Sequence, residues 1–496
     1  MMSMKDQMSS GSQRKYLLSH EEGNDAAACT GATTETSSLL NQTKTDISVG
    51  DIDKQNGTHP RDHVLLNHDR DDKGAEDDKQ TISNISAIVH LLKASIGTGI
   101  LAMPDAIKNS GLVVGPVALV FISVICLSCM HMLVNCSQTL SYRTQKPFMD
   151  YADVAEHAFS SLGPRIGRFG KTARRIINVF IYIDQMGCCC IYILFIAECL
   201  KMVIDHNLGT NIDLTSYLAA TLVPLFLLCS IRNLKRLSPV SMTADILQAT
   251  SLGLVFYYLG QGMILSSELK AYVDLKQYTL FFGTAIFAFD GIPILLPLEN
   301  KMRTPRAMRE WNGVLNTSQS IITCLYVSIG VLGYIKYGEH VKGSIILNLP
   351  VEESLAQAAI IMMSVAICCT YSLNMYVTVQ IIFPEIKPRV SEKWTIFAEF
   401  ILRYGLVLVS FTLAALIPEL DLFISLVGSV SSSTIALIAP PIFHSVTYWN
   451  ELSKKPTGRI RLGINVFISL VGIVGFLAGG YVSLEEIITA FQSDVE

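Results

Sequence analysis

Charged side chains are scarce in this sequence, at 16% of 496 residues against roughly 25% in ordinary soluble proteins. The scarcity is uneven. Residues 1–82 hold 15 acidic and 9 basic side chains, whereas residues 83–496 hold 56 charged residues in 414. So low a charge density excludes a soluble multidomain enzyme for the larger part, and no basic stripe indicates nucleic-acid binding. We therefore predict a membrane-embedded body behind a polar tail.

Cysteine pairs that could form disulfides are also lacking. All of the 12 cysteines except Cys29 lie in or at the ends of apolar segments, and no predicted outer loop offers a facing pair. Adjacent cysteines on one helix point in different directions, which disfavours a metal site, so we expect the cysteines to be small packing residues. We expect no metal and no cofactor, with the proton as the coupling ion.

The N-terminal tail, residues 1–82, has no sustained apolar periodicity and cannot bury enough apolar surface to offset the entropy of ordering. We therefore predict a disordered cytosolic tail. It has no basic n-region followed by an apolar stretch, so we do not expect a signal peptide. Glu35, Leu39 and Leu40 fit an acidic dileucine sorting motif, which predicts trafficking adaptors as partners, and Leu65-Leu66 resembles a second dileucine type.

Eleven stretches are long and apolar enough for membrane helices, because a bilayer core of about 30 Å needs about 20 apolar residues. We predict spans over residues 85–107, 113–137, 176–201, 214–231, 238–264, 278–298, 312–335, 355–382, 395–416, 421–447 and 461–482. The predicted transporter domain is thus 83–482, followed by a short tail over 483–496.

Basic residues orient these spans. With the tail in the cytosol, the inner loops hold 21 Lys and Arg, whereas the outer loops and outer span ends hold six. Cytosolic loops carry the excess of basic residues in membrane proteins. The count therefore predicts a cytosolic N-terminus and a non-cytosolic C-terminus.

Two spans are interrupted by glycine and proline at corresponding positions. Span 1 contains Gly97-Thr98-Gly99 before Pro104, and span 6 contains Asp290-Gly291-Ile292-Pro293 before Pro297. Five spans separate the interruptions, so the two helices run in opposite directions, as in an inverted five-plus-five repeat with its binding site between two broken helices. We predict breaks near 97–99 and 290–293, with span 11 outside the repeat. The alternative is that the glycines only allow close helix packing.

Several motifs match a known family in order. They are Val89-His90-Leu91-Leu92-Lys93, Ile96-Gly97-Thr98-Gly99-Ile100-Leu101, Phe287-Ala288-Phe289-Asp290-Gly291-Ile292, Leu296-Pro297-Leu298-Glu299-Asn300 and Leu426-Val427-Gly428-Ser429-Val430-Ser431-Ser432-Ser433. Over residues 80–485 the chain resembles the proton-coupled amino acid transporters of the amino acid/auxin permease family. The resemblance implies an all-α, leucine-transporter-like fold and uptake of small neutral amino acids with protons. The chain departs from the family pattern at Ala94-Ser95, Asp290 and Ser372-Leu373-Asn374.

A zwitterionic substrate needs groups for a carboxylate and an ammonium. We expect free N–H groups after the first break to bind the carboxylate and freed carbonyls at the second break to bind the ammonium. Side chains of spans 3, 8 and 10 would shape the rest of the pocket. The predicted substrate-binding residues are Ser95, Gly97, Thr98, Gly99, Phe287, Phe289, Asp290, Gly291, Tyr182, Gln185, Asn374, Ser429 and Ser432.

Two ionisable side chains are the candidates for proton coupling. His90 lies seven residues before Gly97, two helical turns away, and an unperturbed histidine titrates near pH 6.5. The resemblance also implies a coupling role for His90. Asp290 adjoins the second break, and an ionisable group inside the membrane indicates function by default. For Asp184, Glu198, Asp245 and Arg403 we expect packing or pairing near span ends instead.

We therefore predict a secondary transporter that carries small neutral amino acids of the glycine, alanine and proline type with protons into the cytosol by alternating access. Two alternatives stay open: an amino acid sensor that signals through the tail to nutrient-signalling proteins, and a sodium-coupled or uncoupled carrier of the same fold. A membrane enzyme would need a convergent nucleophile or metal set, which no spacing provides. The expected location is the plasma membrane, the late endosome or the lysosome.

Overall fold

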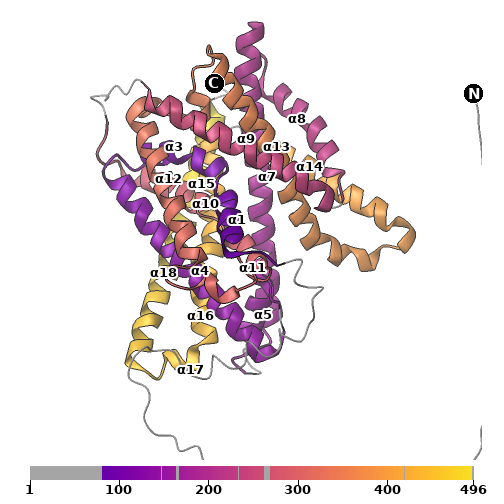
Figure 1. The fold of residues 1–496 in the computed structure, drawn as a ribbon, viewed down its shortest axis with the longest axis vertical. Helices are drawn as coiled ribbons and strands as arrows, with labels where there is room; N and C mark the ends of the chain where they lie inside the picture. The colour runs from indigo at the N-terminus through magenta and orange to yellow at the C-terminus, as the bar shows by residue number, and fades with distance from the viewer. Residues whose placement is uncertain are drawn as a thin grey trace, which may run out of the picture. The chain divides into compact units, whose positions relative to one another are not determined.

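The computed structural model describes residues 81–146, 148–163, 167–232, 234–261, 269–417 and 419–493. All of them lie in one compact unit, Ala75–Glu496. The predicted tail up to residue 80, with Glu35, Leu39 and Leu40, lies outside the described residues. Over the described ranges the fold is built from helices (Figure 1).

The helices overlap the predicted spans, and several of them extend beyond the predicted bounds. The first half of the chain forms α1 (Asn84–Ser95), α2 (Thr98–Leu101), α3 (Met103–Lys108), α4 (Val114–Thr144), α5 (Tyr151–Ser160), α7 (Gly170–Leu208), α8 (Leu214–Cys229) and α9 (Leu234–Gly260). The second half forms α10 (Leu275–Ala288), α11 (Ile292–Glu299), α12 (Val314–Tyr337), α13 (Ser354–Ile386), α14 (Thr395–Leu416), α15 (Leu420–Val427), η8 (Gly428–Ser432), η9 (Thr434–Ile438), α16 (Ala439–Thr447), α17 (Trp449–Leu452) and α18 (Pro456–Ser493).

Within the described residues, eight helical stretches are long and apolar enough to cross a membrane. They contain α4, α7, α10, α12, α13, α14, α15 and α18, one in each stretch. The α18 helix shows why such segments need lipid, because only 22% of its apolar window is buried by the rest of the protein. Side chains such as Phe467, Val474 and Leu477 are more than half exposed on it. The chain is a multi-pass membrane protein.

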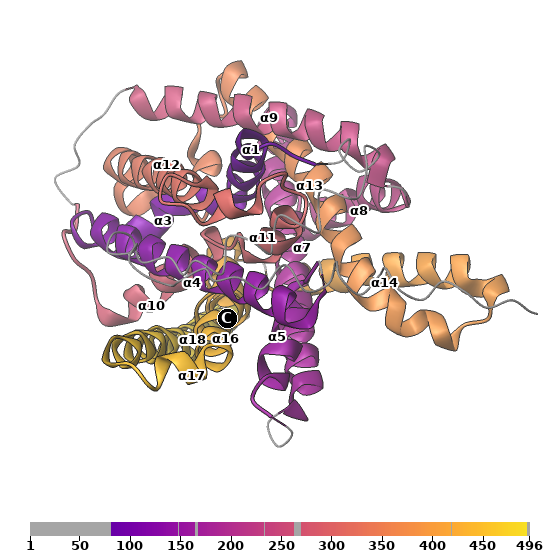
Figure 2. The ribbon, with the colours of Figure 1, turned by 60° about the horizontal axis from the view of Figure 1, so that its bottom comes forward.

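Two groups of helices pack around the interrupted segments. In the first, α12 packs against α1, α3 and α4, and α4 also contacts α11. In the second, α7 packs against α8, α13 and α14, and α13 packs along α9. Figures 1 and 2 both show α9 beside α13 and α12 beside α3. The segment from α15 to η8 lies against both α10 and α7, so it joins the two groups.

The helices break where glycine and proline predict it. Gly97, which precedes α2, is extended at φ −152° and ψ −148°. Phe289, Asp290 and Gly291 separate α10 from α11. Pro104 and Pro293 each lie in the first turn of the following helix, where the missing proline N–H costs no helical hydrogen bond. The helices are thus interrupted at Ile96-Gly97 and at Phe289 to Gly291.

Candidate functional site

The two helix breaks lie directly against each other. A Cβ atom added to Gly99 in α2 would lie 2.8 Å from the Cα of Ala288, the last residue of α10. No side chain fits in that space, so glycine is required for this approach. The contact explains why a glycine stands in the first break, and it brings together two segments about 190 residues apart in the chain.

Polar side chains from neighbouring helices lie within hydrogen-bond distance of the carbonyls that the breaks expose. The Tyr326 hydroxyl on α12 lies 2.6 Å from the carbonyl oxygen of Ser95 and 2.7 Å from that of Ala288, one at each break. The side-chain amide of Gln248 on α9 donates to the carbonyl of Ile96. Buried backbone acceptors require such partners. Tyr326 and Gln248 therefore hold the broken backbone in place.

Gly97 has open space beside it. A Cβ atom added there would meet no heavy atom within 4 Å. Gly291 at the second break is also roomy, because its nearest such neighbour is the Met130 methyl group at 3.6 Å. The first break thus has a tightly packed glycine at Gly99 and an open one at Gly97, which suits a small ligand that approaches the backbone.

Three of the predicted site residues converge on Asp184 of α7. Its Oδ1 accepts hydrogen bonds from Ser432 at 2.8 Å and from Ser431 at 2.9 Å, and Gln185 is its neighbour on α7. The Asp184 side chain interacts directly with that of Asp290 at the second break. Asp184 is wholly buried. An acid in the middle of a predicted span is visible in the sequence and could have indicated a functional residue. For Asp184 we instead expected packing or pairing near a span end.

The other predicted residues divide into two sets. Thr98, Phe287 and Phe289 are buried at the breaks, and the Phe289 ring lies 5.0 Å from the Tyr326 ring. Ser95 ends α1, and Ser429 is buried in η8 with a hydroxyl that has no hydrogen-bond partner in the described part of the chain.

Tyr182 and Asn374 stand apart from that cluster. Asn374 on α13 reaches the Tyr192 hydroxyl of α7 at 3.5 Å. No hydrogen bond among the described residues joins Tyr182 or Asn374 to either break. The carbonyls of Phe287 and Phe289 accept bonds from Asp290 and Gly291 within the second break itself.

His90 lies on an exposed face of α1, beside an ion pair that joins α1 to α9. Lys93 of α1 lies 2.6 Å from Asp245 of α9 and also contacts Ser241. The expected pairing of Asp245 is thus confirmed. So is that of Arg403, which binds Glu399 at 2.9 Å. The buried Oε2 of Glu198 has no hydrogen-bond partner among the residues that the structure describes.

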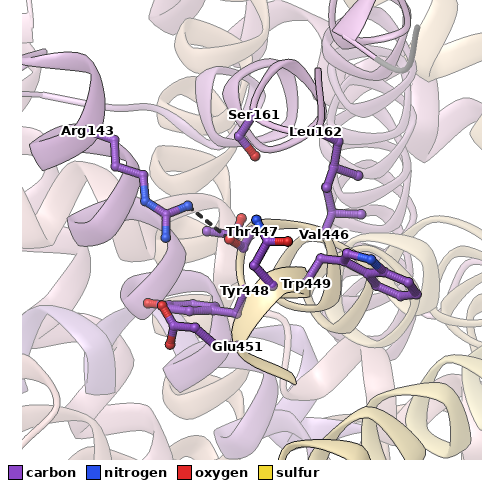
Figure 3. A pocket seen from close by; sticks show the side chains of 9 residues that line it. Arg143, Ser161, Leu162, Val446, Thr447, Tyr448, Trp449 and Glu451 are labelled. Carbon is purple, nitrogen blue, oxygen red and sulfur yellow. Dashed lines mark hydrogen bonds between the residues drawn. The ribbon is translucent and has the colours of Figure 1, made fainter. Parts of the chain in front are cut away.

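A separate cavity of about 100 Å³ lies between the ends of α4 and α5 and the turn from α16 to α17 (Figure 3). Arg143 points into it and donates to the Thr447 carbonyl at 2.9 Å. None of the predicted site residues lines this cavity. We therefore assign it no part in substrate binding.

Comparison with known proteins identifies the family of this chain. Residues 80–484 match the family described as transmembrane amino acid transporter protein. The chain belongs to this family. The transporter is 34% identical to the proton-coupled amino acid transporter-like protein pathetic of Drosophila melanogaster, over 87% of this chain and 91% of that protein. It is 27% identical to the probable amino acid transporter skat-1 of Caenorhabditis elegans, over 83% and 91%.

These relatives confirm the resemblance to the proton-coupled branch and to transporters rather than enzymes. Among solved structures, the transporter is similar to the inward-facing conformation of Mhp1. The two are 14% identical with a TM-score of 0.46, and the match covers 84% of this chain and 92% of that one. A likeness of this degree supports no further conclusion.

Tyr326 and Gln248 are the site residues that sequence reasoning missed. Each lies in the middle of an ordinary apolar helix, and nothing in its local pattern distinguishes it from other polar residues of these spans. Their role depends on which helix passes the breaks. Only the tertiary arrangement reveals that.

Proposed function

We propose that this amino acid transporter carries small neutral amino acids of the glycine, alanine and proline type into the cytosol together with protons. The observation that carries the proposal is the contact between the two breaks, with Gly99 against Ala288 and the Tyr326 hydroxyl between the two backbones. Broken helices that meet in this way provide backbone groups for a zwitterion without a side-chain charge of opposite sign.

We propose eleven spans with an inverted repeat. Three helical segments supplement the eight long apolar stretches: the interrupted α1 to α3, the shorter α8, and α9. Spans 1–5 would form one half and spans 6–10 the other, with α18 outside the repeat. The 21 basic residues in the predicted inner loops support a cytosolic N-terminus. On a lysosome this polarity means export from the lumen to the cytosol.

The substrate would lie beside Gly97, where the space is open, with its carboxylate toward Thr98 and Gly99 and its ammonium toward the second break. Phe287, Phe289 and Gly291 would border it, with Ser95, Gln185, Ser429 and Ser432 nearby. Tyr182 and Asn374 would limit side-chain size from the α7 and α13 side. The lack of a basic residue among these groups supports neutral substrates.

Two side chains would handle the proton. Asp290 would bind it at the second break. His90, exposed in the middle of α1, would pass it toward the cytosol. Rocking of the helix group that contains α1, α4, α11 and α12 against the group that contains α7, α8, α13 and α14 would alternate access.

The alternatives differ in their measurable output. A sensor would bind amino acids with negligible turnover and would signal through residues 1–80, and a sodium-coupled or uncoupled carrier would ignore the pH gradient. We also propose that the protein is located at the plasma membrane or the lysosome. Trafficking adaptors would bind the tail at Glu35, Leu39 and Leu40.

Radiolabelled uptake tests the proposal. Glycine, alanine and proline uptake would be measured at an external pH of about 5.5 and of about 7.4, with and without sodium, which spans the range in which histidine titrates. We expect faster uptake at the lower pH without sodium. Equal rates at both pH values would contradict proton coupling. Binding without uptake would favour the sensor.

A further inference from the structure

Two buried carboxyl groups face each other between α7 and the second helix break. Asp184 is 0% exposed, and its Oδ1 accepts hydrogen bonds from Ser431 and Ser432. Its other oxygen, Oδ2, has no hydrogen-bond donor among the described residues, and neither has the buried Oδ1 of Asp290. The two side chains interact directly with each other. The unpartnered oxygens are therefore explained if each acid is the other's partner.

No positive charge compensates the pair within the described part of the chain. Neither carboxyl group takes part in an ion pair there. The titratable groups that face it are thiols and phenols: Cys188 and Tyr192 on α7, Cys126 on α4, and Tyr151 on α5. Two like charges in contact, away from water, repel strongly, and a carboxylate cannot donate a hydrogen bond to another carboxylate. One of the two acids must hold a proton, as in other buried carboxyl pairs.

The hydrogen bonds favour one arrangement of this proton. The Ser432 hydroxyl donates to Asp184 and stabilises its negative charge. The Ser431 hydroxyl is shared between Asp184 and the Val427 carbonyl. A protonated Asp290 can then donate to the free Oδ2 of Asp184. The serines stand in η8, a π-helical stretch, and such stretches occur frequently at functional sites.

The pair lies between the two groups of packed helices. Asp184 belongs to α7, which packs with α8, α13 and α14, whereas Asp290 joins α10 to α11, which packs against α4. A shared proton attracts these helices to one another, and its loss leaves two facing charges that repel. Protonation of the pair therefore changes the same contact that alternating access must open and close.

We propose that Asp184 and Asp290 share a single proton and together form the site that binds the transported proton. Asp184 is then a second proton-binding residue, beyond Asp290 and His90. This inference rests on the proposed proton-coupled transport. It specifies where the proton binds and why its binding is linked to the movement of the helices.

The test uses the full-length chain, purified and reconstituted in liposomes, with labelled alanine. Two modes are measured: uphill accumulation driven by a pH gradient, and exchange of labelled against unlabelled alanine without a gradient. With one proton per alanine, the native transporter should accumulate alanine up to about tenfold for each pH unit. Asp184→Asn should reduce accumulation to the level without a gradient, because the amide donates permanently to a charged Asp290. Exchange needs no pH gradient, so it shows whether the Asp184→Asn protein still folds and binds alanine.

Controls separate a coupling role from a structural one. Asp205→Asn changes an acid at the far end of α7, where it binds the Tyr217 hydroxyl, and should accumulate alanine normally. Asp184→Glu keeps the carboxyl group and should restore accumulation at least partly. If Asp184→Asn loses both modes, the Asp184→Glu variant distinguishes the two roles. Accumulation by this variant supports the shared proton. A folded Asp184→Glu protein that does not accumulate alanine overturns the shared proton.

The outcomes distinguish the two proposals. If the native protein ignores the pH gradient, proton-coupled transport itself is wrong. If the native protein responds and Asp184→Asn accumulates alanine equally well, proton coupling stands but the shared proton is wrong. Sodium-driven accumulation that Asp184→Asn abolishes would also overturn the inference, because the pair would then bind sodium. Independently of transport, the infrared absorption of a protonated carboxylic acid should be present in the native protein and in Asp205→Asn. The part of this absorption that comes from the pair should be lost in Asp184→Asn, as the difference spectrum against the native protein would show.

Discussion

At the scale of single residues, the first helix break depends on two glycines with opposite requirements. Gly99 is a glycine because the Ala288 backbone leaves no room for a Cβ atom, whereas Gly97 has open space beside it. From the sequence the two positions are equivalent, since either glycine could serve packing or substrate binding. The structure separates them, and each substitution therefore has its own expected effect.

We expect Gly97→Ala to fold normally and to weaken substrate binding. The methyl group meets no protein atom but occupies the space proposed for the substrate, so KM should rise roughly tenfold or more, equivalent to about 1.4 kcal/mol. Gly99→Ala places a methyl group against the Ala288 backbone. This should lower the free energy of unfolding by roughly 1–3 kcal/mol. Uptake kinetics and thermal unfolding in detergent measure the two effects. A stable Gly97→Ala protein with native KM would move the substrate away from the first break.

His90 provides a second test at this scale. If it passes the proton toward the cytosol, His90→Ala should remove the dependence of uptake on cytosolic pH, because an imidazole is the side chain best suited to exchange a proton near neutral pH. The external pH should still drive accumulation through Asp290. Proteoliposomes with internal and external pH set separately measure both responses. His90→Gln, which keeps a polar side chain, is the control for packing, and an unchanged response to internal pH would leave His90 without a role in proton release.

At the scale of elements, ion pairs outside the predicted membrane spans hold α5 against α7. Asp153 and Asp150 cap the start of α5 reciprocally, and Asp153 also binds Lys146 and Arg174, each at 2.7 Å. Burial alone would raise the pKa of Asp153, but hydrogen bonds from Lys146, the Asp150 backbone and Arg174 outweigh it. The pKa therefore lies below its usual value. The charged form of Asp153 thus contributes to stability.

We expect Asp153→Asn to lower the free energy of unfolding by about 1–3 kcal/mol, the range for lost hydrogen bonds to a charged group. A lowered carboxyl pKa gives a contribution that is full above the unfolded value, near pH 4, and is lost as pH falls through the lower folded value. The difference in Tm between the native protein and the variant should therefore be constant near neutral pH and shrink below about pH 4. Lys171→Gln, which removes a basic charge from α7, is the control for a general effect of charge on this helix. A native Tm for Asp153→Asn would show that α5 is held by its apolar face alone.

The elements themselves were accessible to prediction because their causes are local. Apolar length predicts the spans, and glycine with proline predicts where α1 and α10 end. The π-helical turns η8 and η9 were not predicted, although Ser429 and Ser432 were named as site residues. Their geometry arises where α7 and α10 pack against the segment, as Gly187 against Val427 and Gly283 against Ser425 show. Long-range packing of this kind leaves no periodic trace in the sequence.

At the scale of the whole molecule, the polar tail and the membrane body are expected to act independently. Deletion of residues 1–80 should leave uptake per transporter in proteoliposomes unchanged, because the described helices begin after this point. In cells the deletion should redistribute the protein between lysosome and plasma membrane. The double change Leu39→Ala and Leu40→Ala in the full chain should have the same effect on location. Fluorescence microscopy and uptake measure the two, and lost uptake in proteoliposomes would indicate that the tail regulates transport.

At this scale, low charge, span order and paired breaks predicted a membrane body with a binding site, whereas the family and the transport function were indicated by the resemblance of several motifs. The proximity of Asp184 and Asp290 could not be predicted. These residues are 106 positions apart in the chain and meet only through the packing of α7 against the second break. Sequence reasoning found both acids but gave them different roles. It had no measure of their proximity.

The Tyr326 hydroxyl has one further consequence. It carries a single hydrogen, yet it stands within hydrogen-bond distance of two carbonyl oxygens, Ser95 of the first break and Ala288 of the second. At any instant it satisfies only one of them. The junction of the two broken helices therefore always keeps one acceptor in surplus, and the hydrogen can switch sides without any movement of the backbone. A substrate ammonium that took up the surplus acceptor would fix the direction of that hydrogen, so an empty and an occupied transporter would differ in the orientation of a single hydroxyl.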